Sequence, residues 1–162
     1  MEIKGVDMGS GLEDLEVLKE AEKVADEIWD LTARWDRLAR EVVGVQLARA
    51  ADSVGANIAE AFGRFHYFDK IRFLYYARGS LFETRFWLNR AAHRQLMHGP
   101  QAEDLHQRLA RIARQLNAFV RILKAQSHSA RGAARSIREP PTADYSTSTG
   151  PDRGPFVPED TA

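Results

Sequence analysis

Residues Gln46 to Trp87 read QLARAADSVGANIAEAFGRFHYFDKIRFLYYARGSLFETRFW. This segment gives the clearest indication of the fold. In its first half, apolar residues recur at steps of four and three, which places them on one face of a helix: Leu47, Ala51, Val54 and Ile58. The second half shows a similar period in Phe73, Tyr76, Ala77, Ser80, Thr84, Trp87 and Leu88. An aromatic turn joins the two runs. The stretch therefore predicts two consecutive helices that pack on each other.

Small residues accompany both runs. Beside the first stripe they are Ala48, Gly55, Ala56 and Ala59. Gly79 lies in the middle of the second run, where glycine costs a helix about 1 kcal/mol relative to alanine. This pattern predicts a tight helix crossing, with Gly79 against the surface of residues 55–59, so that a larger side chain at Gly79 would overpack the contact.

Two segments of this stretch, SVGANIAEAFGR (residues 53–64) and RFLYYARGSLFE (residues 72–83), resemble the bacterial four helix bundle protein family. That family was first noticed as proteins encoded in intervening sequences of 23S rRNA genes. The matching positions are Gln46, Ala51, Ser53, Asn57, Ile58, Ala59, Glu60, Gly63, Arg64, Phe73, Ala77, Gly79, Ser80 and Glu83; Ala61 departs from the glycine usual there. The accessory variability determinants of diversity-generating retroelements are similar to this family. In that branch, the resemblance implies a pentamer that works with a reverse transcriptase and RNA or DNA.

The flanking sequence supplies two further helices, which predicts an all-α, up-down-up-down four-helix bundle. We expect helices over residues 12–34, 45–62, 69–97 and 101–127, with a break before Val45 marked by Gly44. Residues 1–10 are predicted to be a flexible N-terminus and residues 11–127 the bundle. Five of the six prolines fall in residues 128–162, among Ser, Thr and Gly, which predicts a disordered tail.

Composition excludes several classes of protein. The chain has no cysteine, so disulfides and thiolate metal sites are excluded. It has no run of 18 apolar residues and no signal-peptide pattern at its start, which predicts a cytoplasmic protein without a membrane partner. No nucleophile with an activating base, no phosphate loop and no metal-ligand spacing among the five histidines are present, so we expect no enzyme, cofactor, metal or small-molecule substrate.

Polar residues on the two central helices are predicted to form a structural polar core: Ser53, Asn57, Ser80 and Glu83. In this interpretation they make hydrogen bonds between helices and fix their register. The alternative is a contact to a ligand or to nucleic acid. Aromatic residues left beside the apolar stripes predict a homo-oligomer interface instead: Phe65, Tyr67, Phe68, Tyr75, Phe82 and Phe86.

Charge is unevenly distributed although the net charge is zero. Residues 1–35 hold 4 basic and 10 acidic residues, and residues 36–127 hold 15 basic and 8 acidic ones. Together with the resemblance, this favours nucleic-acid association through five phosphate-contacting residues: Arg72, Arg85, Arg108, Arg111 and Arg121. The first alternative is that these arginines only solvate helix faces. The second is an oligomeric scaffold that binds another protein, because a committed nucleic-acid binder usually has a pI above 9.

Overall fold

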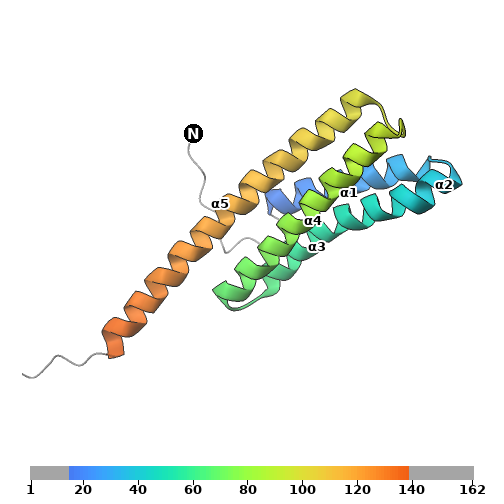
Figure 1. The fold of residues 1–162 in the computed structure, drawn as a ribbon. Helices are drawn as coiled ribbons and strands as arrows, with labels where there is room; N and C mark the ends of the chain where they lie inside the picture. Colours follow the sequence, from blue (N-terminus) through green and yellow to red (C-terminus); the bar gives the residue numbers. More distant parts are fainter. Residues whose placement is uncertain (1–14, 139–162) are drawn as a thin grey trace, which may run out of the picture.

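The computed structural model describes residues 15–138, with side chains described to residue 129. Its long helices are α1 (Glu16–Ala33), α3 (Val45–Gly63), α4 (Tyr67–His93) and α5 (Gly99–Arg138). A short helix, α2 (Arg37–Ala39), leads through one π-helical turn (Arg40–Gly44) into α3 without a break. The four long helices run alternately up and down (Figure 1), which confirms the predicted all-α four-helix bundle. In this described part, no helix is long and apolar enough to cross a membrane.

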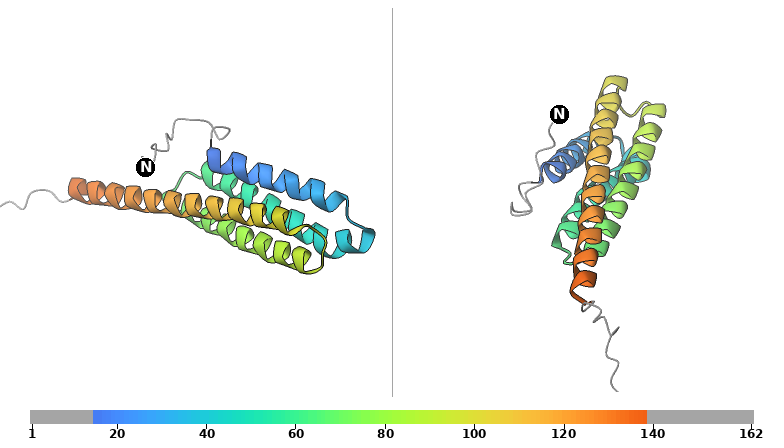
Figure 2. Two further views of the ribbon diagram at one scale, coloured as in Figure 1. Left: turned by 90° about the horizontal axis from the view of Figure 1, so that it is seen from above. Right: turned by 90° about the vertical axis from the view of Figure 1, so that its left-hand side faces the viewer.

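Each long helix packs on two neighbours. Helix α3 contacts α1 and α4, and α5 likewise contacts α1 and α4, so α1 and α4 occupy diagonally opposite corners of the bundle (Figure 2). Helix α5 has 40 residues, about 60 Å at 1.5 Å per residue, and projects past the other three (Figure 1). The predicted end near Ser127 is therefore wrong, because the helix continues to Arg138. The predictions for residues 1–10 and for the tail beyond Arg138 lie outside the described residues.

The core consists mainly of aliphatic side chains. Ile28, Leu47, Ile58, Leu74, Leu81, Leu105, Ile112 and Leu123 are almost fully buried. On α4 the buried stripe is Leu74, Ala77, Leu81, Thr84, Leu88 and Ala91. The predicted stripe on this helix is thus partly wrong, because Tyr76 is exposed and Phe73, Ser80 and Trp87 are only half-buried. On α4, leucine and alanine fill most of the narrow space between the helices, and none of the aromatic rings of this helix is fully buried.

The glycine at a tight helix contact is Gly44 rather than Gly79. Gly79 is exposed, and a Cβ atom built on it would have no neighbour within 4 Å, so the predicted crossing there is wrong. It lies opposite the buried stripe of α4. Gly44 is buried within continuous helix, and a Cβ atom there would lie 3.3 Å from Thr32 Cβ and 3.6 Å from Trp35 Cε3. Gly44 therefore does not break the helix but lets it approach the end of α1.

The connection between α1 and α2 turns in a few residues. Helix α1 ends at Ala33, and the Asp36 side chain then caps α2 by accepting a hydrogen bond from the Ala39 N–H at 2.9 Å. This cap restarts the helix at Arg37. The sequence predicts only a break between residue 34 and Val45, so the prediction for this segment is wrong.

Candidate interaction surface

Most of the predicted interface aromatics are exposed. Phe65 and Phe68 are 91% and 74% exposed, and Tyr75, Phe82 and Phe86 are each about half exposed. Tyr67 differs, because it is partly buried and packs against the core. The structure therefore leaves five of the six aromatic side chains outside the core of a single chain.

Four of these residues form one continuous feature, the aromatic stripe: Phe68, Tyr75, Phe82 and Phe86. The first three are seven residues apart and Phe86 follows four later, which is the spacing of a helix seam. Gly79 falls in the same row, four residues after Tyr75. Since the buried stripe of α4 faces α3 and α5, the aromatic stripe faces outward.

Basic side chains lie against the aromatic stripe. The Arg78 and Arg85 guanidinium groups lie 5.1 Å and 5.8 Å from the centre of the Phe82 ring. From α5, the Lys124 ammonium lies 5.7 Å from the centre of the Tyr75 ring. These distances are within the range of cation–π attraction. The outer surface of α4 is therefore both aromatic and basic, and Lys124 of α5 adds a further positive charge beside it.

Arg108 does not belong to this surface, which corrects its prediction as a nucleic-acid contact. Its side chain is only 14% exposed and points at α1. Its Nε donates to Glu20 at 2.8 Å and its Nη1 to Glu27 at 2.6 Å. Such charge-assisted hydrogen bonds are the strong class, so Arg108 joins α5 to α1. The sequence contains a clue to this contact. Glu20 and Glu27 are seven residues apart and therefore lie on the same side of α1, where one arginine can reach both.

The other four predicted arginines lie on two helices. Arg72 is exposed on α4 and forms an ion pair with Asp69 at 3.4 Å. Arg85 is half-buried on α4 and close to α5, where its charge lowers the pKa of His106, second to the larger effect of burial. Arg111 and Arg121 are exposed on α5 and form no ion pair with any side chain of residues 15–129.

The predicted polar core is not an interhelical network. Ser53 Oγ donates to the Arg49 carbonyl at 2.7 Å, and Asn57 Nδ2 donates to the Ser53 carbonyl at 2.8 Å. Ser80 accepts through its carbonyl from Thr84 Oγ1 at 2.8 Å. Each bond runs one turn back within its own helix, a frequent arrangement for short polar side chains.

Glu83, the fourth member of that set, is exposed. The prediction of register-fixing hydrogen bonds among these four residues is therefore wrong. Among residues 15–129, the side-chain hydrogen bonds and ion pairs between the long helices are those of Arg108.

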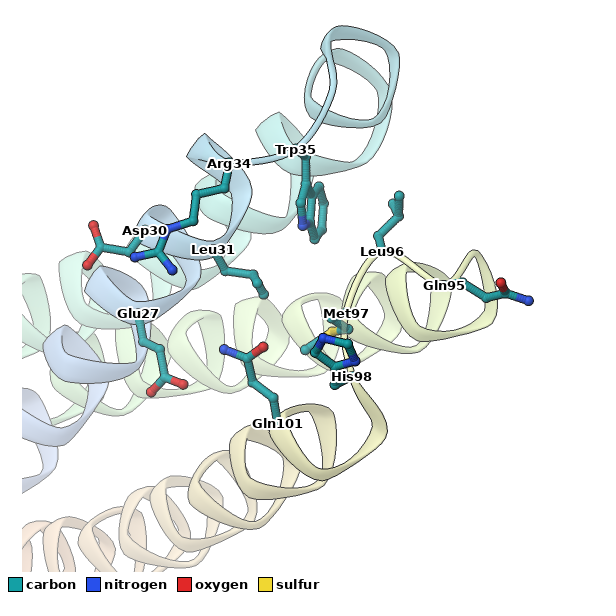
Figure 3. Close-up of a pocket in the computed structure, with 10 residues that line it drawn as sticks. All are labelled: Glu27, Asp30, Leu31, Arg34, Trp35, Gln95, Leu96, Met97, His98 and Gln101. Atoms are coloured by element: carbon teal, nitrogen blue, oxygen red, sulfur yellow. The ribbon is translucent and has the colours of Figure 1, made fainter.

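A hollow of about 460 Å³ opens at one end of the bundle, between the end of α1 and the loop from α4 to α5 (Figure 3). Leu31, Trp35, Leu96 and Met97 line its apolar part, with Gln101 of α5 facing it. The Trp35 indole N–H is buried and has no hydrogen-bond partner among the side chains and backbone that the structure describes. Among the residues the structure describes, no three His, Asp or Glu side chains converge as a metal site would require.

The fold and surface together define an all-helical bundle protein whose distinctive feature is an exposed aromatic and basic face. The family model of the 23S rRNA-intervening sequence proteins matches residues 13–118, and the chain belongs to this family. The sequence resemblance to that family is thereby confirmed. No protein of curated function matches the chain significantly.

A solved structure supports the same assignment. It is the 1.70 Å crystal structure of a protein of unknown function from the S23 ribosomal protein family of Bacteroides thetaiotaomicron. The two sequences are 26% identical, the match covers 64% of this chain and 97% of the other, and the TM-score is 0.58. Nearly all of the similar chain thus matches about two thirds of the present one.

Proposed function

We propose that this protein is a non-catalytic, self-associating helical-bundle accessory protein that associates with nucleic acid. One observation carries the proposal, namely the exposed arginines on α5: Arg111, Arg114 and Arg121. Helix α1 has six acidic and two basic residues, whereas residues 99–129 of α5 have two acidic and five basic ones. Among residues 15–129, Arg108 is the one basic residue of α5 that pairs with the acidic side chains of α1. A basic surface of this kind attracts the phosphate backbone.

The nucleic-acid surface that we propose lies on the outer side of α5. Arg111 and Arg121 belong to it, together with Arg114, and all three side chains are exposed. They suit phosphate contacts, which need charge and reach but no fixed base-reading geometry. Arg72 and Arg85 are less suitable, because Arg72 is paired with Asp69 and Arg85 lies beside Phe82.

Self-association would strengthen the attraction between the basic surface of α5 and the phosphate backbone. The single chain has a net charge of zero, so one copy is a weak attractor of phosphate. In an oligomer the basic surfaces of several copies add, while exposed apolar patches such as the aromatic stripe usually mark an interface. From the resemblance to the retroelement determinants, we expect a pentamer and a reverse transcriptase as its partner. A reverse-transcriptase gene beside the coding sequence would support that partner.

Binding to short nucleic acids tests the proposal. We expect weak, sequence-independent binding of single-stranded and duplex RNA or DNA at about 50 mM salt, weakening steeply as salt rises. The variant R111E/R121E should bind more weakly, and its salt slope on single strands should fall by about 0.7 for each phosphate that the variant no longer neutralises.

The matched control is R37E/R49E, which makes the same charge change at two exposed arginines away from α5. It should retain binding much better than R111E/R121E. If the two variants lost the same amount of binding affinity, the loss would depend only on net charge, and the proposed surface on α5 would be refuted. No retention of any of the nucleic acids by the wild-type oligomer would refute nucleic-acid association.

A protein-binding scaffold without nucleic-acid association is the second candidate. The aromatic stripe favours it, because apolar rings beside arginines are typical of protein interfaces. The two candidates differ in the salt-dependent binding just described, which the scaffold would lack.

A further inference from the structure

We infer that the aromatic stripe of one copy docks into a groove between α1 and α3 of a second copy, so that the contact is heterologous. This inference rests on the proposed self-association and specifies its geometry. The inference is based on two complementary surfaces of the same chain. One is the aromatic stripe on α4, and the other is a groove lined by small residues between α1 and α3.

The groove is built by the small residues of α3. One hollow lies between Leu18, Ala21 and Ala25 of α1 and the α3 segment containing Gly55 and Ala56. A second hollow, which shares Ala56 and Ala59 with the first, continues it to Arg64. The α3 side of the groove therefore runs from Ala51 to Arg64, about 20 Å at the helical rise.

Shape matches this groove to the aromatic stripe. The stripe extends from Phe68 to Phe86, about 27 Å along α4, and Gly79 at its middle lets another backbone come close. Large side chains on one helix and small residues on the facing one allow close helix packing. In the proposed contact, the small residues of α3 would meet α4 of a second copy, whereas within the single chain Gly79 has no neighbour.

Charge matches the two surfaces as well. The groove rim carries Glu22 and Asp26 of α1 and Asp52 of α3, all exposed. None of the three forms an ion pair with residues 15–129. Beside the stripe stand Arg78 and Arg85, which are in contact with Phe82. Docking would place these arginines along an acidic rim, an arrangement that favours one orientation over its reverse.

The position of the two surfaces makes the contact heterologous. The stripe lies on the outer side of α4, and the groove lies on another face, between α1 and α3. Helices α1 and α4 occupy diagonally opposite corners of the bundle (Figure 2). One copy can therefore offer its stripe to one neighbour and its groove to another. Such head-to-tail contacts form rings when the rotation between copies closes, and open filaments when it does not.

Two single variants of the full chain test the inference. A56W fills the groove at an exposed alanine, and F82E puts an acid into the middle of the stripe. Each should weaken self-association by about tenfold or more in sedimentation equilibrium, as expected at the centre of an interface. The controls Q107W and V42E make similar changes at exposed sites off both surfaces and should associate as wild type. Circular dichroism should show unchanged helix content in all four.

Mixing distinguishes the heterologous contact from stripe-on-stripe pairing. A56W retains an intact stripe and F82E an intact groove, so an equimolar mixture should form a 1:1 dimer of twice the 18.3 kDa chain mass. Failure of the mixture to form this dimer overturns the inference. It is also overturned if A56W associates like wild type while F82E is monomeric, and then the proposed self-association still stands. A monomeric wild-type chain at tens of micromolar overturns both.

Discussion

Gly44 and Gly79 allow one substitution to be compared at two helical glycines in opposite environments. Leucine favours helix over glycine by about 0.8 kcal/mol at either position. At Gly44 the new Cβ atom would lie 3.3 Å from Thr32 Cβ, and three further carbon atoms must fit beyond it. Both Cβ atoms are fixed to helical backbone, so neither can rotate away. The contact can be relieved only by separating the π-helical turn from α1.

The expected magnitudes follow from this geometry. Overpacking a well-packed site costs about 1–3 kcal/mol, and Gly44→Leu should fall at the upper end because its first added atom is already crowded. After subtraction of the helix-propensity gain, the net loss is about 2 kcal/mol. Gly79→Leu meets no neighbour within 4 Å of its Cβ atom, so it should gain about 0.8 kcal/mol. The two variants should then differ by about 3 kcal/mol in free energy of unfolding.

Urea and thermal melts measure this difference. At about 4 °C per kcal/mol, Gly44→Leu should melt about 8 °C below wild type and Gly79→Leu about 3 °C above it. All melts should use one low protein concentration, because self-association makes Tm depend on concentration. If Gly44→Leu were as stable as wild type, the close approach at Gly44 would not constrain the fold. A large loss in Gly79→Leu would restore the tight crossing that the structure excludes.

Three further predictions concern α5. Arg108→Met should cost about 1–3 kcal/mol in urea melts, because Glu20 and Glu27 lose their charged hydrogen bonds; the exposed control Arg121→Met should cost almost nothing, and equal losses would contradict the ion-pair argument. Burial, and secondly Arg85, lower the pKa of His106 below 6.5, so the unfolded state binds the proton more readily. Stability should therefore fall as the pH drops from about 7 to 5, and His106→Gln should flatten this dependence; thermal melts of both proteins that fell in parallel would exclude His106 as the cause. Truncation after Ser129 should leave Tm within a few degrees, since Leu123 is the last buried residue of α5 among the described side chains, and a large decrease would show that the removed segment packs on the bundle.

The amino-acid pattern alone was enough to predict the four long helices, their order and much of the core. The steps of four and three in Leu47, Ala51, Val54 and Ile58 repeat along α3, and all four residues are buried. The seam of α5, including Leu105, Ile112 and Leu123, is buried as well. Such periods follow from local helix geometry, which needs no knowledge of the neighbouring helices. Exclusion of most aromatic residues from the core was also predictable, because more apolar residues were present than one bundle can bury.

Three features depend on how the helices pack: the face of α4 that is buried, the glycine that lies at a close contact, and the arginine that is held by carboxylates. Apolar residues occur around most of α4, so its period did not select between the stripes containing Phe73 and Leu74; the close packing of α3 and α5 made that choice. Gly44 and Gly79 are both helical glycines, and only the distance to α1 separates them. Arg108 and Arg111 are both arginines of α5, and nothing in the adjacent sequence distinguishes them. In the structure, Arg108 pairs with two carboxylates of α1. Contacts between residues more than 80 positions apart depend on how the helices are placed in space, which local periodicity does not specify.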